Sequence, residues 1–202
     1  MSTGDDETGP EAGTALCLSG GGYRAMLFHV GVLWRLNEAG VLRGLKRVSS
    51  VSGGSITAGV LGRNWGDLGF QGDVATRFRE AVVTPARKLA RTDIDVTGIL
   101  GGALSPWTSI PERVEKIYDA TLFDGATMQD LPDEPRFVFN ATNLESGALM
   151  RMSKRYLADY RVGRVDRPTI PLAKAVTASS AFPPFLSPCR SCCWCWSLYP
   201  CR

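Results

Sequence analysis

The stretch Ser19-Gly20-Gly21-Gly22-Tyr23-Arg24 follows a short apolar run, Thr14 to Leu18 (TALCL). Consecutive glycines after an apolar run are typical of a tight turn between a strand and a helix. Beyond the glycines, from Arg24 to Ala39, apolar residues recur at helical spacing, and Gly40 suits a helix C-cap. We therefore predict a strand over residues 14–18 that is buried in the protein, then a glycine turn and a helix.

The same pattern follows immediately. Lys46 to Val51 (KRVSSV) is a second run that favours a strand, Ser52-Gly53-Gly54 is a second glycine turn, and Ser55 to Leu61 resumes helical spacing. Two strand–turn–helix units in succession favour parallel strands with helices packed on the sheet. The predicted fold class is α/β.

The rest of the chain adds mixed elements. Pro111 suits the first turn of a helix, and Asn143 to Gly147 is turn-like between two strand patterns, which predicts a hairpin. The predicted elements are helices over 73–91, 110–122 and 171–180, a Gly-rich loop over 92–107, and strands over 136–142 and 148–153.

Composition narrows the class of protein. The chain has 202 residues, a formal net charge of +3, 44% hydrophobic and 21% charged residues. These values are those of an ordinary globular protein and give no reason to expect a nucleic-acid binder. No apolar run reaches the ~18 residues of a membrane span. Residues 1–13 are acidic and lack the apolar core of a signal peptide, so we predict a disordered lead-in and a cytoplasmic protein.

The first glycine turn suits an anion. Backbone amides without Cβ obstruction, together with a helix N-terminus, form a nest for a phosphate or for the oxyanion of acyl transfer. Gly20-x-Gly22-x-x-Ala25 also fits the dinucleotide fingerprint. However, the second strand pattern ends in Ser49 to Ser52, without the carboxylate that would hold a ribose. A nucleotide- or phosphate-binding module remains the alternative function.

The second glycine turn favours catalysis. A strand that ends at Ser52, with small residues on both sides and a helix after it, has the pattern of a nucleophile elbow. The motif G-x-S-x-G is met in part, because its first position is Ser50. Since the turn lies on the second βα unit, directly after a glycine nest on the first, we predict that Ser52 is a nucleophile.

The serine needs a base. His29, the single histidine, lies mid-helix and precedes the serine, against the Ser–Asp–His order of hydrolase elbows. We interpret it as a histidine packed in the core. The base is then expected to be a carboxylate that acts directly on Ser52.

Three blocks in this order, SGGGYRA, SSVSGGS and TASSAFPPFLSP, resemble the patatin-like phospholipases. The resemblance runs from about Ala15 to Pro188. It implies a three-layer α/β/α sandwich with a mainly parallel sheet, and a lipid acyl hydrolase with a Ser–Asp dyad that uses no metal or other cofactor.

The resemblance also implies roles for single residues. Ser52 would be the nucleophile, and Gly20, Gly21 and Gly22 would form the oxyanion hole with the amide of Gly53. Arg24 stands in the place of the family's arginine, with a role near the oxyanion loop or the lipid phosphate. The implied partner is a lipid or acyl ester, at a membrane surface or free of one.

The sequence departs from the family pattern at the dyad. The family's Asp lies in a D-G-[GA] motif after the third block, and no acidic residue follows Asp166. Asp124-Gly125-Ala126 spells the motif but lies far upstream, and we interpret it as a surface turn. Ser19 replaces an Asp that many members carry. A chain without the dyad Asp is expected to be inactive or nearly so, and poorly soluble.

The last fourteen residues, Cys189 to Arg202 (CRSCCWCWSLYPCR), differ in character from everything before them. A zinc site lacks a separated second Cys pair, and a disulfide cluster conflicts with the missing signal peptide. The third interpretation is a tail read out of frame, which sequencing the DNA beyond codon 188 would test. Under this third interpretation, residues 14–188 are an incomplete, C-terminally truncated hydrolase domain, and residues 189–202 are an aberrant tail.

A basic stretch lies between Arg151 and Arg167, with six Lys and Arg against Asp159 and Asp166. It suits anionic lipid headgroups, and equally an ordinary solvated surface. The predicted protein is therefore cytoplasmic, with a peripheral membrane surface as an open alternative.

Overall fold

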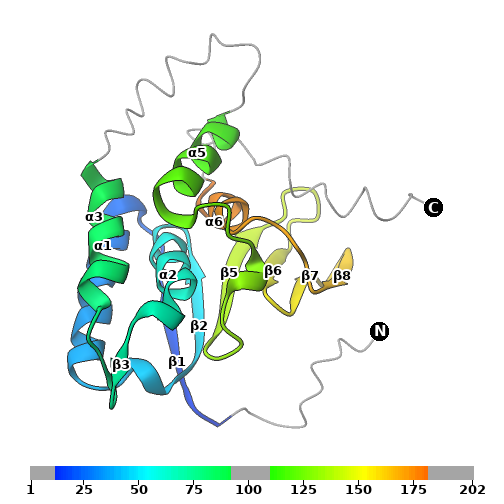
Figure 1. Ribbon diagram of the computed structural model, residues 1–202. Coiled ribbons are helices and arrows are strands. Elements are labelled where there is room, and N and C mark those ends of the chain that lie inside the picture. The colour runs from blue at the N-terminus through cyan, green and yellow to red at the C-terminus, as the bar shows by residue number, and fades with distance from the viewer. Residues whose placement is uncertain (1–11, 92–109, 182–202) are drawn as a thin grey trace.

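The computed structural model describes residues 12–91 and 110–181 (Figure 1). Its main sheet begins with three parallel strands and continues as an antiparallel meander. This arrangement confirms the α/β class and the predicted hairpin. In spatial order the strands are β1 (Thr14–Leu18), β2 (Leu45–Val51), β5 (Arg136–Thr142), β6 (Leu149–Ser153), β7 (Tyr156–Asp159) and β8 (Gly163–Asp166).

Helices α1 (Gly22–Glu38) and α2 (Gly53–Arg63) follow the first two strands, as the glycine turns predict. Helix α2 packs against β1, β2 and β5, with α1 on one side and α6 (Leu172–Ser180) on the other. Helix α3 (Thr84–Arg91) packs against α1, and α5 (Ile110–Tyr118) packs against α6.

Short elements complete the described fold. Five-residue π-helical segments precede α3 and follow α5. These π-helical segments are Arg79–Val83 and Asp119–Phe123. The 3₁₀ turns are Leu42–Gly44, Trp65–Asp67 and Met128–Asp130. A small hairpin is formed by β3 (Phe70–Gln71) and β4 (Val74–Ala75).

One layer of helices covers one face of the sheet. The chain steps from β1 to β2 to β5 in the same direction, so right-handed crossovers place α1 and α2 on the same side. Between α2 and the sheet lie fully buried side chains, among them Val48, Ile56, Phe137 and Phe139. Burial of such apolar area supplies most of the stabilisation of this layer.

Much of the opposite face of the sheet is exposed among the described residues, although Val138 of β5 is buried there. Ala15 and Cys17 of β1 are exposed, as are Val51 of β2 and Leu149 of β6. The prediction of a strand buried throughout was therefore wrong for β1, where only Leu18 is buried. The reason is that β1 is an edge strand whose second face, which carries Ala15 and Cys17, is not covered by the described helices.

The predicted helix over 73–91 begins later than the sequence suggests. Val74 and Ala75 form β4, and the helical backbone starts at Arg79. The cause is the buried side chain of Asn37, which donates to the Ala75 carbonyl (2.9 Å) and accepts from the Ala75 N–H (2.7 Å). The predicted loop over 92–107, the lead-in over 1–11 and the tail lie outside the described residues.

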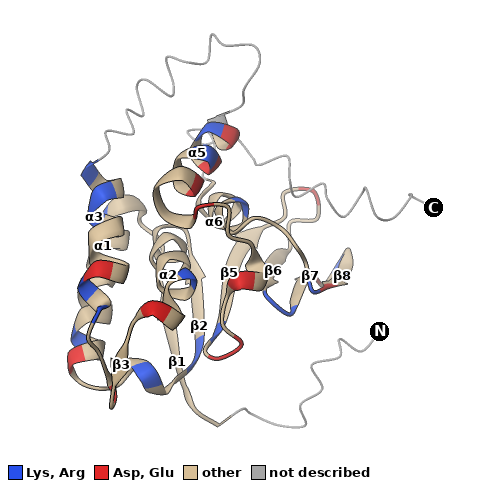
Figure 2. Cartoon of the chain, viewed as in Figure 1, with Lys and Arg blue, Asp and Glu red and all other residues tan. Residues whose placement is uncertain are grey.

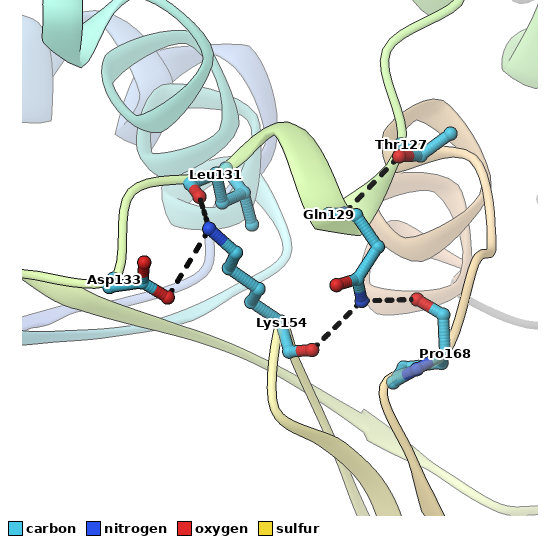
Figure 3. A network of polar contacts seen from close by, with 6 residues as sticks. All are labelled: Thr127, Gln129, Leu131, Asp133, Lys154 and Pro168. Atoms are coloured by element: carbon cyan, nitrogen blue, oxygen red, sulfur yellow. Dashed lines mark hydrogen bonds and ion pairs between the residues drawn. The ribbon is translucent and has the colours of Figure 1, made fainter.

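A polar network ties the connection before β5 to the β6–β7 turn (Figure 3). The Gln129 amide donates to the carbonyls of Lys154 (2.9 Å) and Pro168 (2.8 Å). Lys154 in turn donates to the Leu131 carbonyl (2.7 Å) and pairs with Asp133 at 3.2 Å. These bonds hold three separate segments together at the end of the sheet where the parallel strands begin.

Charge is mixed over the surface. Helix α5 carries both basic and acidic residues, whereas the charged residues of α3 are all basic: Arg87, Lys88 and Arg91 (Figure 2). In the basic stretch, the guanidinium carbons of Arg151 and Arg164 lie 5.7 and 4.7 Å from the ring centre of buried Tyr156, so both pack on the protein's own sheet. Within residues 12–91 and 110–181, no helix has the length and apolarity to span a bilayer.

Candidate active site

Ser52 lies at the sharp turn between β2 and α2, and its backbone has a conformation that residues other than glycine rarely adopt. Its φ is 55° and its ψ is −123°. Such a backbone costs on the order of 1–3 kcal/mol and persists only where the surroundings enforce it. The Ser52 carbonyl accepts from the N–H groups of Ser55 (2.8 Å) and Ile56 (3.2 Å), which starts α2 directly. This strand–turn–helix is the geometry of a nucleophile elbow.

The residues after Ser52 are glycines because no side chain fits there. A Cβ at Gly53 would lie 2.2 Å from the Gly22 carbonyl oxygen, and a Cβ at Gly54 would lie 2.5 Å from that of Leu18. Both distances are far below any real contact. The elbow is therefore packed backbone to backbone against the first glycine turn.

The first turn reaches Ser52 itself. A Cβ built on Gly20 would lie 3.2 Å from the Ser52 Cβ and 3.8 Å from its Oγ. Gly21 and Gly22 have φ of 136° and 64°, values that favour glycine, and α1 starts at Gly22. The structure thus brings together all five residues of the predicted nucleophile and oxyanion hole: Ser52, Gly20, Gly21, Gly22 and Gly53.

This juxtaposition has a chemical consequence. The first N–H groups of a helix have no partner within the helix, and α1 and α2 both begin beside Ser52. Neither helix has a side-chain cap on its first N–H groups. Two sets of amide donors and two positive helix ends therefore flank the hydroxyl, an environment that suits a developing oxyanion.

Beneath the elbow lies a cluster of buried hydroxyls that sequence reasoning missed. The Ser52 N–H donates to the Oγ of Ser179 (3.0 Å), at the end of α6. Ser179 also contacts Ser55 (2.8 Å) and the Asn140 carbonyl (2.6 Å). The third motif block contains Ser179, and the adjacent serines before the prolines were the available signal.

A second polar chain links the elbow to α1. The Ser180 hydroxyl donates to the Ser52 carbonyl (3.4 Å) and hydrogen-bonds Tyr118, which hydrogen-bonds Tyr23 beside Gly22. Burial raises the pKa of the Tyr118 phenol far above its ordinary value and also raises the pKa of Tyr23. Both phenols stay protonated at neutral pH, so this chain fixes the two turns and does not supply a base.

His29 supports the first glycine turn. It is 5% exposed, and its Nε2 lies 2.9 Å from the Ser19 carbonyl oxygen, so that nitrogen carries the proton and donates it. Its contacts confirm the interpretation as a packed histidine. Its hydrogen bond holds the loop that carries Gly20. It also gives the Ser19 carbonyl, which faces the buried side of α1, a hydrogen-bond donor.

The remaining predicted residues lie at the surface. Arg24 is exposed on the first turn of α1, the turn that begins the anion nest. Asp124 is exposed in a left-handed turn (φ 49°), and its N–H closes the helix by donating to the Asp119 carbonyl (2.8 Å). That geometry matches the predicted surface turn.

Among residues 12–91 and 110–181, no carboxylate is hydrogen-bonded to Ser52, and no group of three or more His, Cys, Asp or Glu could hold a metal ion. The described residues thus place the Ser52 hydroxyl beside helix N-terminal amides, which is the arrangement that a nucleophile and an oxyanion would need. They do not offer the base.

Comparisons with known proteins give one family model and several solved structures of similar fold. The family model described as patatin-like phospholipase matches residues 16–191. Human GIVD cytosolic phospholipase A2 in complex with methyl γ-linolenyl fluorophosphonate superposes with a TM-score of 0.57 at 15% identity, over 82% of this chain and 28% of that one. A second structure of that human enzyme gives a TM-score of 0.52 at 18% identity, over 83% of this chain and 28% of the human chain.

At these identities the structural likeness concerns the fold. The chain spans little more than a quarter of the human enzyme's length. No curated protein matches the sequence.

Proposed function

The chain belongs to the patatin-like phospholipase family, and from this premise we propose that it carries the nucleophile half of a serine lipid acyl hydrolase site. The single observation that carries the proposal is the packing of the Ser52 elbow against the first glycine turn, with Gly20 beside the Ser52 hydroxyl. Unrelated tight turns would not need to meet in this way.

In the proposed reaction, the Ser52 Oγ attacks the carbonyl carbon of an acyl ester. The carbonyl oxygen becomes an oxyanion, which the amides of Gly21, Gly22 and Gly53 stabilise. Each such donor contributes roughly 10²–10³ to the rate in comparable sites. The dyad Asp that the family resemblance implies would take the Ser52 proton during the attack and give it to the departing alcohol. In a second step the same Asp would take a proton from water, which attacks the acyl-serine, and would return it to the Ser52 oxygen as the acid leaves.

Arg24 is proposed to meet the anionic part of the substrate. Arg24 is exposed on the first turn of α1, two residues after Gly22, and its guanidinium is always charged. A phospholipid places a phosphate a few bonds from its ester, so one cation at this distance suits the class. The proposed partner is therefore a lipid or another acyl ester, presented at a membrane surface or in solution.

Among the described residues, the base of the dyad is not found. The family resemblance implies an Asp that acts directly on Ser52, and the described residues place no carboxylate against the hydroxyl. Loss of the base from a catalytic set costs on the order of 10⁴ in kcat, with residual rate from the oxyanion hole. We propose that this chain turns esters over slowly or not at all.

The test is labelling by a fluorophosphonate, which needs one attack by the serine and no turnover. Intact mass after long incubation should show one adduct, and peptide mapping should place it on Ser52. Ser52→Ala should abolish it, whereas Ser49→Ala, a change three residues earlier in β2, should leave it. If the protein is not labelled but nucleotides raise its melting temperature, the phosphate-binding alternative replaces the hydrolase.

A further inference from the structure

The third motif block ends α6 with two serines, and the proposed chemistry assigns no task to the first of them. Ser179 is 7% exposed and lies directly beneath the elbow. It contacts three groups from different elements: the Ser52 N–H (3.0 Å), the Ser55 hydroxyl (2.8 Å) and the Asn140 carbonyl (2.6 Å). One side chain from the end of α6 thus touches the elbow, α2 and β5.

The single proton of Ser179 fixes the direction of these bonds. The Asn140 carbonyl can only accept, so Ser179 donates its proton there. The Ser179 oxygen must then accept from the Ser52 N–H and from Ser55. The Ser55 proton is shared with Ser50, which lies 3.0 Å away and itself donates to the Val138 carbonyl (3.4 Å).

The Ser52 N–H depends on this acceptor. The parallel pairing of β2 with β1 ends at Ser50, and its pairing with β5 ends at Val51. Ser52 therefore lies one residue past the sheet and before the first hydrogen bond of α2, where backbone pairing supplies no acceptor. A side chain must supply it, because the elbow is packed against protein on this side.

From these contacts we propose that Ser179 is a positioning residue, which holds the Ser52 backbone in its left-handed conformation and so aims the hydroxyl at the glycine nest. This inference rests on the proposed function only for its catalytic consequence. We call the hydrogen bond from the Ser52 N–H to the Ser179 hydroxyl the anchor, and it does not depend on the proposed function.

The test compares Ser179→Ala with Ser153→Ala in the full chain. Ser153 is a matched control: its hydroxyl is also buried, accepts from a backbone N–H and donates to a backbone carbonyl, both of Tyr156 (3.1 Å), on the distant strand β6. Both variants remove a buried hydroxyl with two backbone bonds, so both lower stability. Only Ser179→Ala removes the acceptor of the Ser52 N–H.

Two measurements distinguish the hydrogen bond between Ser179 and the Ser52 N–H from its effect on the reactivity of Ser52. The first is hydrogen exchange of the Ser52 amide, measured under conditions where both variants are folded. It should be at least tenfold faster in Ser179→Ala than in the parent chain, and unchanged in Ser153→Ala. The second is the rate of fluorophosphonate labelling, which should fall about 10–100-fold in Ser179→Ala alone, the cost of a small misplacement of a reacting group.

Each outcome decides a claim. Faster exchange with slower labelling in Ser179→Ala alone supports the proposal. Unchanged exchange at Ser52, or equal labelling losses in the two serine variants, overturns it. If the parent chain is not labelled at all while the exchange result holds, the anchor stands and the hydrolase proposal fails.

Discussion

Gly53 lies so close to Gly22 that a single added methyl group would place a carbon 2.2 Å from the Gly22 carbonyl oxygen. The two residues are thirty-one positions apart in sequence and belong to different strand–turn–helix units. Their contact packs the two glycine turns against each other, and the position of the proposed oxyanion donors relative to Ser52 depends on it.

Gly53→Ala should therefore separate the two turns. We expect loss of fluorophosphonate labelling by 10²-fold or more, because groups that must converge are displaced, together with a clear fall in melting temperature. Labelling kinetics and thermal unfolding measure both effects. The control is Gly31→Ala in α1, where the added methyl meets nothing within 4 Å, and where alanine should stabilise the helix by up to ~1 kcal/mol.

Gly20→Ala tests access to the Ser52 hydroxyl without separating the two glycine turns. The added methyl would lie 3.2 Å from the Ser52 Cβ and 3.8 Å from its Oγ, tight but not impossible contacts, and the Gly20 backbone is not in the left-handed region. We expect a small change in melting temperature and at least tenfold slower labelling, since the methyl crowds the approach to the hydroxyl. Labelling at the parental rate would mean that the substrate reaches Ser52 from another side.

Asp124→Asn tests the upstream D-G-A sequence. The residue is exposed and ends a helix with a left-handed φ of 49°, a conformation that asparagine tolerates well. The expected result is an unchanged melting temperature and unchanged labelling of Ser52. A loss of labelling comparable with that in Ser52→Ala would identify Asp124 as the dyad acid.

Asp159 makes stability depend on pH. Burial opposes its ionisation, but hydrogen bonds from Ser146 (2.6 Å), the Arg161 N–H (2.8 Å) and Asn143 (2.7 Å) outweigh burial and lower its pKa. A carboxyl whose pKa is lower in the folded state stabilises the protein above the unfolded pKa of ~3.9, and this stabilisation is lost as pH falls through the folded value.

Asp159→Asn should then cost about 1–3 kcal/mol at pH 7, because an amide cannot accept all these donors. The difference in unfolding free energy between parent and variant should shrink steadily below pH 4. Urea unfolding at several pH values measures it. A difference that stays constant from pH 7 to pH 3 would show that the carboxylate charge is not what holds the β5–β6 turn to β7.

Much of the fold was predictable because its signals are local. The glycines at 20–22 and 53–54 each follow a strand pattern. Gly21 and Gly22 have positive φ values that favour glycine, and a Cβ at Gly53 or Gly54 would collide with backbone. The hairpin of β5 and β6 could be placed from Asn143 to Gly147 in the same way. These positions are decided by what the backbone does within a few residues.

What escaped prediction depends on residues far apart in the chain. Asn37 converts part of a predicted helix into β4 through bonds to Ala75, thirty-eight positions away. The apolar run from Thr14 to Leu18 predicts a buried strand, yet β1 is an edge strand with one open face. The link from Ser179 to Ser52 spans 127 positions, and no local pattern reports such a bond.

The central claim is that the Ser52 hydroxyl and the amides of the two glycine turns converge on one oxyanion. A crystal structure of the fluorophosphonate adduct tests it most directly, because the phosphonyl oxygen stands where that oxyanion forms. We expect phosphorus bonded to the Ser52 Oγ and its free oxygen within about 3.2 Å of the amide nitrogens of Gly21, Gly22 or Gly53. A phosphonyl oxygen turned to solvent, or an adduct on any other residue, would contradict the account.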